Sequence, residues 1–161
     1  MKKQIITIMI LLLFGGGRLF AQEKDSVVTL PAITITGSAK VSNELSKAFK
    51  KSFPGAEDLK WYKLDQDYLA KFIKDDLAHN ALFKKNGFLK YDITYGHESN
   101  LPEQAHEMIQ EAYKDYNITT AINVKSAGRD IWVVHLEGLK NLVTVRVEDQ
   151  DLEEVERFEK S

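Results

Sequence analysis

The sequence contains no cysteine and little proline or glycine, with three prolines and nine glycines among 161 residues. The lack of cysteine excludes a disulfide-stapled domain, a lipid-modified N-terminal cysteine and a cysteine nucleophile. The low glycine and proline content excludes collagen-like and low-complexity chains. The charges are nearly balanced, 22 basic against 24 acidic, so the chain lacks the basic field that nucleic-acid binding requires.

The beginning of the chain has the pattern of an export signal. Lys2 and Lys3 precede an apolar run from residue 5 to residue 14, and Leu19-Phe20-Ala21 offers a cleavage site. A run of about ten residues is too short to span a bilayer, which takes roughly 20. We therefore predict a signal peptide over residues 1–21 and a periplasmic or secreted protein without stable membrane insertion. Cleavage would remove three basic residues and change the net charge from −2 to −5.

Residues 22–39 start polar and then become rich in β-branched side chains. Ile33 to Thr36 lie between Pro31 and Gly37, which are residues that bound strands and turns. This segment is predicted to be either an N-terminal leader or an edge strand.

One helix and four strands are predicted next. The helix lies between Ser42, a suitable N-cap, and the stop at Pro54-Gly55. Asn86-Gly87 is a strong hairpin signal before the last strand. The helix has an apolar stripe at Val41, Leu45, Ala48, Phe49 and Phe53, and the strands are expected at residues 58–64, 68–74, 78–84 and 88–95.

The same order of elements then recurs. Leu101-Pro102-Glu103 opens a second helix, followed by strand-like stretches at residues 118–125, 130–137, 142–148 and 152–158. An offset of 64 aligns Ala48-Phe49-Lys50 with Ala112-Tyr113-Lys114, Tyr68 with Trp132, Phe72 with Leu136 and Ala81 with Val145. We predict an α+β fold in which two tandem α-β4 units, residues 40–98 and 99–161, share one core and one curved antiparallel sheet with the helices packed on one face.

No catalytic or metal-binding constellation is present in the sequence. The histidines have no metal-ligand spacing, and no nucleophile motif occurs. Acidic pairs such as Asp75-Asp76 are sequence neighbours, so on a strand they point to opposite faces. We therefore predict a protein that is not an enzyme, with no catalytic residue, cofactor or metal. The four histidines are His79, His97, His106 and His135.

Aromatic side chains on the predicted strands have two interpretations. They pack in the core beneath the helices, or they stand on the open face of the sheet and anchor a protein partner. Lysines at positions 71, 85 and 90 are predicted to belong to a solvated sheet face and to protect its edges. The candidate partner-binding residues are Trp61, Tyr68, Phe72 and Trp132.

These features together resemble a known family. The residues that carry the resemblance are Ala48-Phe49, Phe53-Pro54-Gly55-Ala56, Trp61, Tyr68-x-Ala70-x-Phe72, Asn86-Gly87, Leu101-Pro102, Ile109 and Tyr113-x-x-Tyr116. They resemble the PepSY-like, β-lactamase-inhibitor-protein-like (BLIP-like) periplasmic proteins of Bacteroidetes. The resemblance implies tandem α-β4 units with a concave sheet face that engages a partner enzyme or another exported protein.

From the residues and the resemblance we predict an exported, non-catalytic binding module. It would recognise or inhibit an envelope protein, such as a peptidase or another hydrolase, through the sheet face. The alternative is a periplasmic carrier of a small peptide or apolar ligand, which requires an apolar cavity between sheet and helices.

Overall fold

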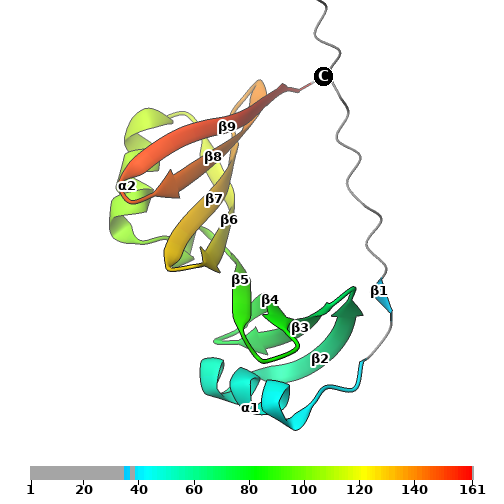
Figure 1. The fold of residues 1–161 in the computed structure, drawn as a ribbon. Helices are drawn as coiled ribbons and strands as arrows, with labels where there is room; N and C mark the ends of the chain where they lie inside the picture. The colour runs from blue at the N-terminus through cyan, green and yellow to red at the C-terminus, as the bar shows by residue number, and fades with distance from the viewer. Residues whose placement is uncertain (1–34, 37–38, 161) are drawn as a thin grey trace, which may run out of the picture. The chain divides into compact units, whose positions relative to one another are not determined.

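The computed structural model describes residues 35–36 and 39–160 (Figure 1). The predicted signal peptide lies outside the described residues, as does most of the predicted leader segment. Two residues of that segment form a short strand, β1 (Ile35–Thr36), which pairs antiparallel with β2.

The remaining elements form two successive units of one helix and four strands. The first unit comprises α1 (Asn43–Ser52), β2 (Glu57–Leu64), β3 (Asp67–Lys74), β4 (Leu77–Lys84) and β5 (Leu89–Gly96). The second comprises a short 3-10 helix, η1 (Glu98–Asn100), then α2 (Glu103–Ala112), β6 (Asn117–Ser126), β7 (Arg129–Glu137), β8 (Asn141–Glu148) and β9 (Asp151–Glu159). All strands pair antiparallel in chain order within one sheet. The predicted α+β fold with two α-β4 repeats is confirmed.

Hydrogen bonds at the first turn fix the start of each helix. The Ser42 side chain accepts a hydrogen bond from the backbone N–H of Leu45 at 3.2 Å, which caps the start of α1. Pro102 precedes α2, and its carbonyl accepts the N–H of His106 at 3.0 Å. Each helix buries a pair of side chains one turn apart: Leu45 and Phe49 in α1, Ala105 and Ile109 in α2.

The predicted repeat offset of 64 holds for two strand pairs but is wrong for the helices. Ala70 and Val134, on β3 and β7, are both fully buried and 64 residues apart. The buried helix pairs and the helix ends are instead 60 residues apart. The difference arises in the first hairpin: β6 and β7 have ten and nine residues, whereas β2 and β3 have eight each.

Each helix covers its own hydrophobic cluster, so the prediction of one core shared by both repeats is wrong. The first cluster contains Leu45, Phe49, Phe53, Trp61, Ala70, Phe72, Ala81 and Phe83. The second contains Ala105, Ile109, Ala121, Val134, Leu136, Val143, Val145 and Val147.

Strand register places both clusters on the same face of the sheet. Ala81 lies opposite Asp92, and Asp92 lies opposite Lys125 on β6. Lys125 is four residues from Ala121, so it points to the same face as the second cluster. The predicted packing of both helices on one face is therefore confirmed, and the opposite face has no helix on it among the described residues.

Candidate functional site

The structure places the four predicted anchor residues on the helix-covered face. Trp61 and Phe72 belong to the first cluster and are only 9% and 3% exposed. Their rings lie 5.5 and 5.0 Å from that of Phe49 on α1, centroid to centroid. Tyr68 is partly buried against the first cluster and Trp132 against the second. The anchor interpretation is therefore corrected: Trp61, Phe72 and Tyr68 pack with the small Ala70 and Ala81 beneath α1, and Trp132 packs against the cluster beneath α2.

The opposite side of the sheet, which we call the open face, has a different set of side chains. Direct cross-strand partners point to the same face, so register alone traces one row across five pairings. That row runs from Lys60 through Lys71, Asn80, Ile93 and Val124 to Ile131. The residues of the open face considered below are Lys60, Tyr62, Leu69, Lys71, Asn80, Leu82, Tyr91, Ile93, Tyr95, Ile122, Val124, Ile131 and Val133.

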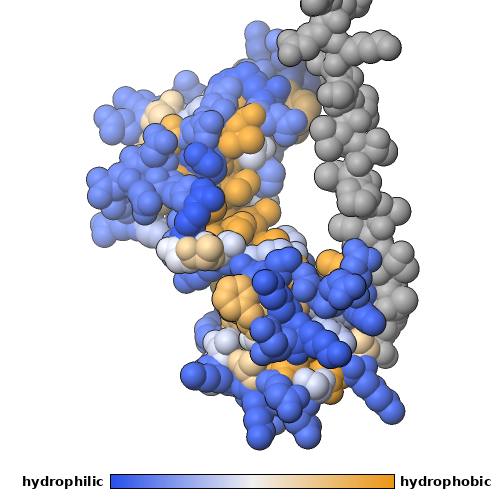
Figure 2. Space-filling model, in the orientation of Figure 1, coloured by the Kyte–Doolittle hydropathy of each residue, from blue (hydrophilic) through white to orange (hydrophobic). Residues whose placement is uncertain are grey.

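The middle of the open face is apolar although no helix within residues 39–160 covers it. Six side chains on β5, β6 and β7 form this apolar centre, and five of them are half-buried. The sixth, Tyr95, is 41% exposed. In Figure 2 hydrophobic residues gather over the strands of the second repeat, whereas hydrophilic residues dominate around α2. The apolar centre consists of Ile93, Tyr95, Ile122, Val124, Ile131 and Val133.

A second feature of the open face is a row of leucines flanked by tyrosines. Tyr62 lies opposite Leu69, Leu69 opposite Leu82, and Leu82 opposite Tyr91. Both leucines are buried, whereas both tyrosines are half-buried. The open face of the first repeat thus presents aromatic rings around a small apolar base, an arrangement suited to contact with another protein surface.

Polar side chains separate the two clusters on the helix-covered face. The two carboxylate oxygens of Asp92 lie 3.2 and 3.1 Å from Nδ1 of His79, and Oγ1 of Thr94 lies 3.1 Å from the same nitrogen. The His79 ring also stacks on Phe72 at 4.9 Å. A hydrolytic triad needs the acid and the nucleophile on opposite ring nitrogens, and here both partners share Nδ1. This cluster therefore orients His79 without forming a triad.

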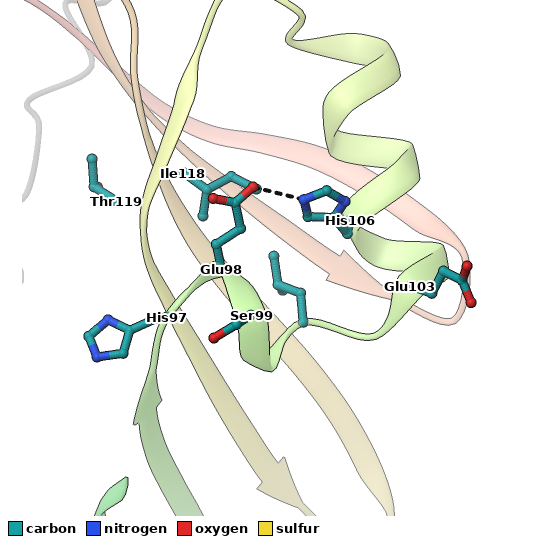
Figure 3. Close-up of a pocket in the computed structure, with 8 residues that line it drawn as sticks. His97, Glu98, Ser99, Glu103, His106, Ile118 and Thr119 are labelled. Carbon is teal, nitrogen blue, oxygen red and sulfur yellow. Dashed lines mark hydrogen bonds and ion pairs between the residues drawn. The ribbon is translucent and has the colours of Figure 1, made fainter.

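A pocket of about 690 Å³ lies beside η1 and the start of α2 (Figure 3). His106 Nε2 and Glu98 Oε1 are 2.8 Å apart in it, and both side chains are partly exposed. Figure 3 shows His97 pointing to the other side of the chain and Glu103 pointing away from this pair. Beyond the His106–Glu98 pair, the other charged groups of the pocket, His97 and Glu103, do not point to the same place. Among the described residues, no three histidine or acidic side chains could hold a metal ion.

Comparison with solved structures identifies the class of fold, which is BLIP-like. A BLIP-like protein from Bacteroides fragilis superposes with a TM-score of 0.61 and 20% identity, over 74% of this chain and 89% of that one. A DUF2874 family protein from Bacteroides uniformis gives 0.59 and 14%, over 74% and 90% of the two chains. A protein described as a candidate periplasmic protein of Bacteroides eggerthii gives 0.58 and 13%, over 75% and 90%. The resemblance found in the sequence is confirmed at the level of the fold.

No family model matches the sequence, and no curated protein is significantly similar to it. In the part of the chain that the structure describes, no helix is long and apolar enough to cross a membrane.

The sequence did contain a signal for the apolar centre. On β7 the run Ile131-Trp132-Val133-Val134 is apolar at both alternating positions, so both faces of that strand must be apolar. On β6, Ile122 and Val124 alternate with Ala121 and the buried Asn123 in the same way. The positions of the large aromatic residues do not indicate this aliphatic surface, because it consists of side chains that are usually assigned to a core.

Proposed function

We propose that this protein is an exported, non-catalytic binding module that recognises another exported or envelope protein through the open face of its sheet. The observation that carries the proposal is the apolar centre, a continuous group of aliphatic side chains and one tyrosine over which neither helix of the described residues lies. Large uncovered apolar patches on folded proteins mark interaction sites. Inhibition of an envelope peptidase or another hydrolase is the form of recognition that the BLIP-like fold suggests, by analogy alone.

The composition of the open face fits a protein partner. Protein interfaces combine a well-packed apolar middle with tyrosine and a charged rim. Here Tyr62, Tyr91 and Tyr95 border the apolar side chains, and Lys60 and Lys71 stand toward the β2 edge. The mature charge of −5 that signal cleavage would leave argues against nucleic acid or anionic lipid as the partner.

A photo-crosslinking experiment tests the proposal directly. A photoreactive phenylalanine derivative is placed at Tyr95 on the open face, and separately at Lys47 on the outer side of α1, in the full chain expressed in its native host. We expect a discrete protein adduct from position 95 and none from position 47. Equal adducts from both positions, or none from position 95, would contradict recognition through the open face.

A double substitution measures how much the apolar centre contributes to partner binding. Ile122 and Val133 lie directly opposite each other on β6 and β7. Changing both to threonine keeps their β-branched shape and removes apolar surface, so the adduct at position 95 should fall several-fold while the circular dichroism spectrum stays unchanged. Val155→Thr, at an exposed position of β9, is the matched control and should leave the adduct unaltered.

The alternative prediction of a small-ligand carrier has less support. It requires apolar space between the sheet and a helix, but aromatic rings fill that region in the first repeat. The Phe53 ring lies 4.7 Å from Phe72 and 6.2 Å from Phe83, and Phe49 lies 5.0 Å from Phe72. These are ordinary packing distances between aromatic rings, so the rings leave no room for a ligand among themselves.

A further inference from the structure

Two lysines on the open face stand directly opposite each other. Lys60 on β2 pairs with Lys71 on β3, and both side chains are exposed. Like charges at directly opposite positions destabilise a sheet. Among the described residues neither ammonium group forms a salt bridge, whereas Lys90 on the same sheet pairs with Asp67 at 2.8 Å. The Lys60–Lys71 pair is therefore unfavourable for folding, and the neighbouring side chains do not neutralise it.

The surroundings of the pair form a shallow hollow of about 340 Å³ on the first repeat. Lys71 Nζ lies 5.5 Å from the centre of the Tyr62 ring, which holds the lysine over an aromatic surface. Asn80, opposite Lys71, donates a hydrogen bond from Nδ2 to the Tyr95 hydroxyl at 3.0 Å. That hydroxyl can still donate its own proton. Asp58 also lines the hollow, but its carboxylate is not within salt-bridge distance of either lysine.

We propose that the Lys60–Lys71 pair receives an aspartate or glutamate side chain of the protein partner. This inference rests on the proposed function and specifies the chemistry of the bound surface. The partner carboxylate would neutralise both ammonium groups and relieve their mutual repulsion, while its apolar neighbours would lie on the apolar centre. The same cross-strand row connects the two parts, since it passes from Lys71 through Asn80 to Ile93 and Val124.

Charge elsewhere in the chain favours a single carboxylate over a polyanion. Residues 40–98 carry eleven basic and nine acidic side chains, whereas residues 99–161 carry seven basic and thirteen acidic ones. A polyanionic glycan or lipid surface would meet repulsion from the second repeat. An isolated acidic side chain within an apolar protein surface meets two lysines and one acidic residue, Asp58, in this hollow.

The test uses a defined probe, because the partner is not identified. The probe is a short peptide with two glutamates between leucines, and its matched control has glutamine in place of glutamate. Each is titrated into the isotope-labelled full chain, and amide resonances are followed by NMR. We expect saturable shifts at Lys60, Lys71 and Asn80 with the glutamate peptide only. Equal shifts with both peptides, or no binding at millimolar concentration, would overturn the proposal.

Matched variants separate a specific site from general charge attraction. The double variant Lys60→Gln/Lys71→Gln should bind the glutamate peptide about tenfold more weakly, as expected for the loss of two exposed charge contacts. Lys47→Gln/Lys50→Gln removes the same charge from α1 and should bind within about twofold of the unchanged protein. An equal loss of affinity in both double variants would show that the glutamate peptide responds to net charge and not to this site. Tighter binding of dextran sulfate than of the glutamate peptide would identify a polyanion site instead.

The free protein offers an independent measurement. Because the two lysines repel each other, Lys60→Gln, which leaves the contact of Lys71 with the Tyr62 ring in place, should raise the melting temperature of the unbound chain. An unchanged or lower melting temperature would contradict the unfavourable pairing. Failure of this site and failure of the proposed function are distinguishable: an adduct at position 95 that persists in Lys60→Gln/Lys71→Gln supports recognition but excludes this contact.

Discussion

Gly87 lies where the hairpin between β4 and β5 approaches α1. Its φ is +84°, and a Cβ atom there would lie 2.7 Å from the Cβ of Ala48. Gly55 has a similar φ of +78° but open space around it. The first position therefore combines a backbone constraint with a close approach of two elements, and the second has the backbone constraint alone.

This pair of glycines allows a controlled prediction. Gly55→Ala should cost about 1 kcal/mol of unfolding free energy, because alanine must adopt a left-handed conformation. Gly87→Ala should cost about 2–3 kcal/mol, since it adds an overlap with the helix to the same strain. Urea denaturation of both variants measures the difference. Equal losses would show that α1 moves away from the hairpin without cost.

A small ionic group joins β9 to the end of α2. Arg157 donates to both oxygens of Glu154 at 2.8 and 2.6 Å, and the Tyr113 hydroxyl donates to Oε2 at 2.9 Å. Hydrogen bonds from Arg157 and then from Tyr113 lower the pKa of Glu154 below its ordinary value of 4.5. All three groups are partly exposed, so solvent screens the pairing.

The sign of the resulting pH dependence follows from that shift. A carboxyl group with a lowered folded-state pKa contributes stability that is fully present above its unfolded value of 4.5 and is lost as the pH falls through the folded value. The unchanged protein should therefore exceed Glu154→Gln in melting temperature near neutral pH, by a small margin that vanishes in acid. Melting curves at several pH values between neutral and about 3 measure this margin. A margin that grows in acid would contradict the assignment.

At the scale of elements, the turn between β8 and β9 is strained. Asp149 and Gln150 join β8 to β9 with φ values of 48° and 71°. Two successive positive φ angles define the hairpin turn that prefers Asn-Gly or Asp-Gly. Glutamine at the second position is poorly suited to this conformation because its Cβ crowds the backbone.

Relaxing this turn should stabilise the protein. We expect Gln150→Gly to raise the free energy of unfolding by about 0.5–1 kcal/mol, since the removal of left-handed strain exceeds the extra entropy of glycine in the unfolded chain. Gln150→Ala keeps the strain and is the control. If the alanine variant gains as much, the glutamine side chain and not the backbone is the source of the strain.

The elements show what sequence patterns can and cannot predict here. Strand bounds agree with the predictions to within a residue or two, because alternation and turn residues are local signals. The offset between the helices was wrong because the β6–β7 hairpin is longer than the β2–β3 hairpin, so one constant offset cannot align both the helices and the later strands. Local patterns set the lengths of the elements but not how the two repeats align. The anchors were misplaced for a related reason: alternation shows that Trp61 and Tyr62 face opposite sides, but not which side α1 covers.

At the scale of the whole molecule, the two hydrophobic clusters share no residue. Between them on the helix-covered face lie Asp92, Thr94 and Asn123, which are polar. Asp92 and Asn123 are nonetheless buried, and each has a hydrogen-bond partner. The link between the halves is thus made by strand pairing, by polar contacts on the helix-covered face, and on the open face by the apolar cross-strand pairs Ile93–Val124 and Tyr95–Ile122.

This arrangement predicts additive losses. Phe49→Leu and Ile109→Val, one in each cluster, should each cost about 1–2 kcal/mol of unfolding free energy. The double variant should lose the sum to within about 0.5 kcal/mol, because the sites share no packing partner. Urea denaturation of the two single variants and the double variant measures the coupling. A deviation from the sum of more than about 0.5 kcal/mol would mean that the two clusters are energetically coupled through the β5–β6 pairing.

The last strand, β9, ends the sheet and is exposed along almost its whole length. Its sequence places Glu153, Glu154, Glu156 and Glu159 around the isolated Val155 and Phe158. An edge strand with free backbone groups can template the addition of a strand from another molecule, and charged side chains there oppose it. These glutamates should therefore prevent chains from joining edge to edge into fibrils even at the high protein concentration of a crowded compartment. Variants in which these glutamates are neutralised would aggregate visibly during storage while each molecule is still folded.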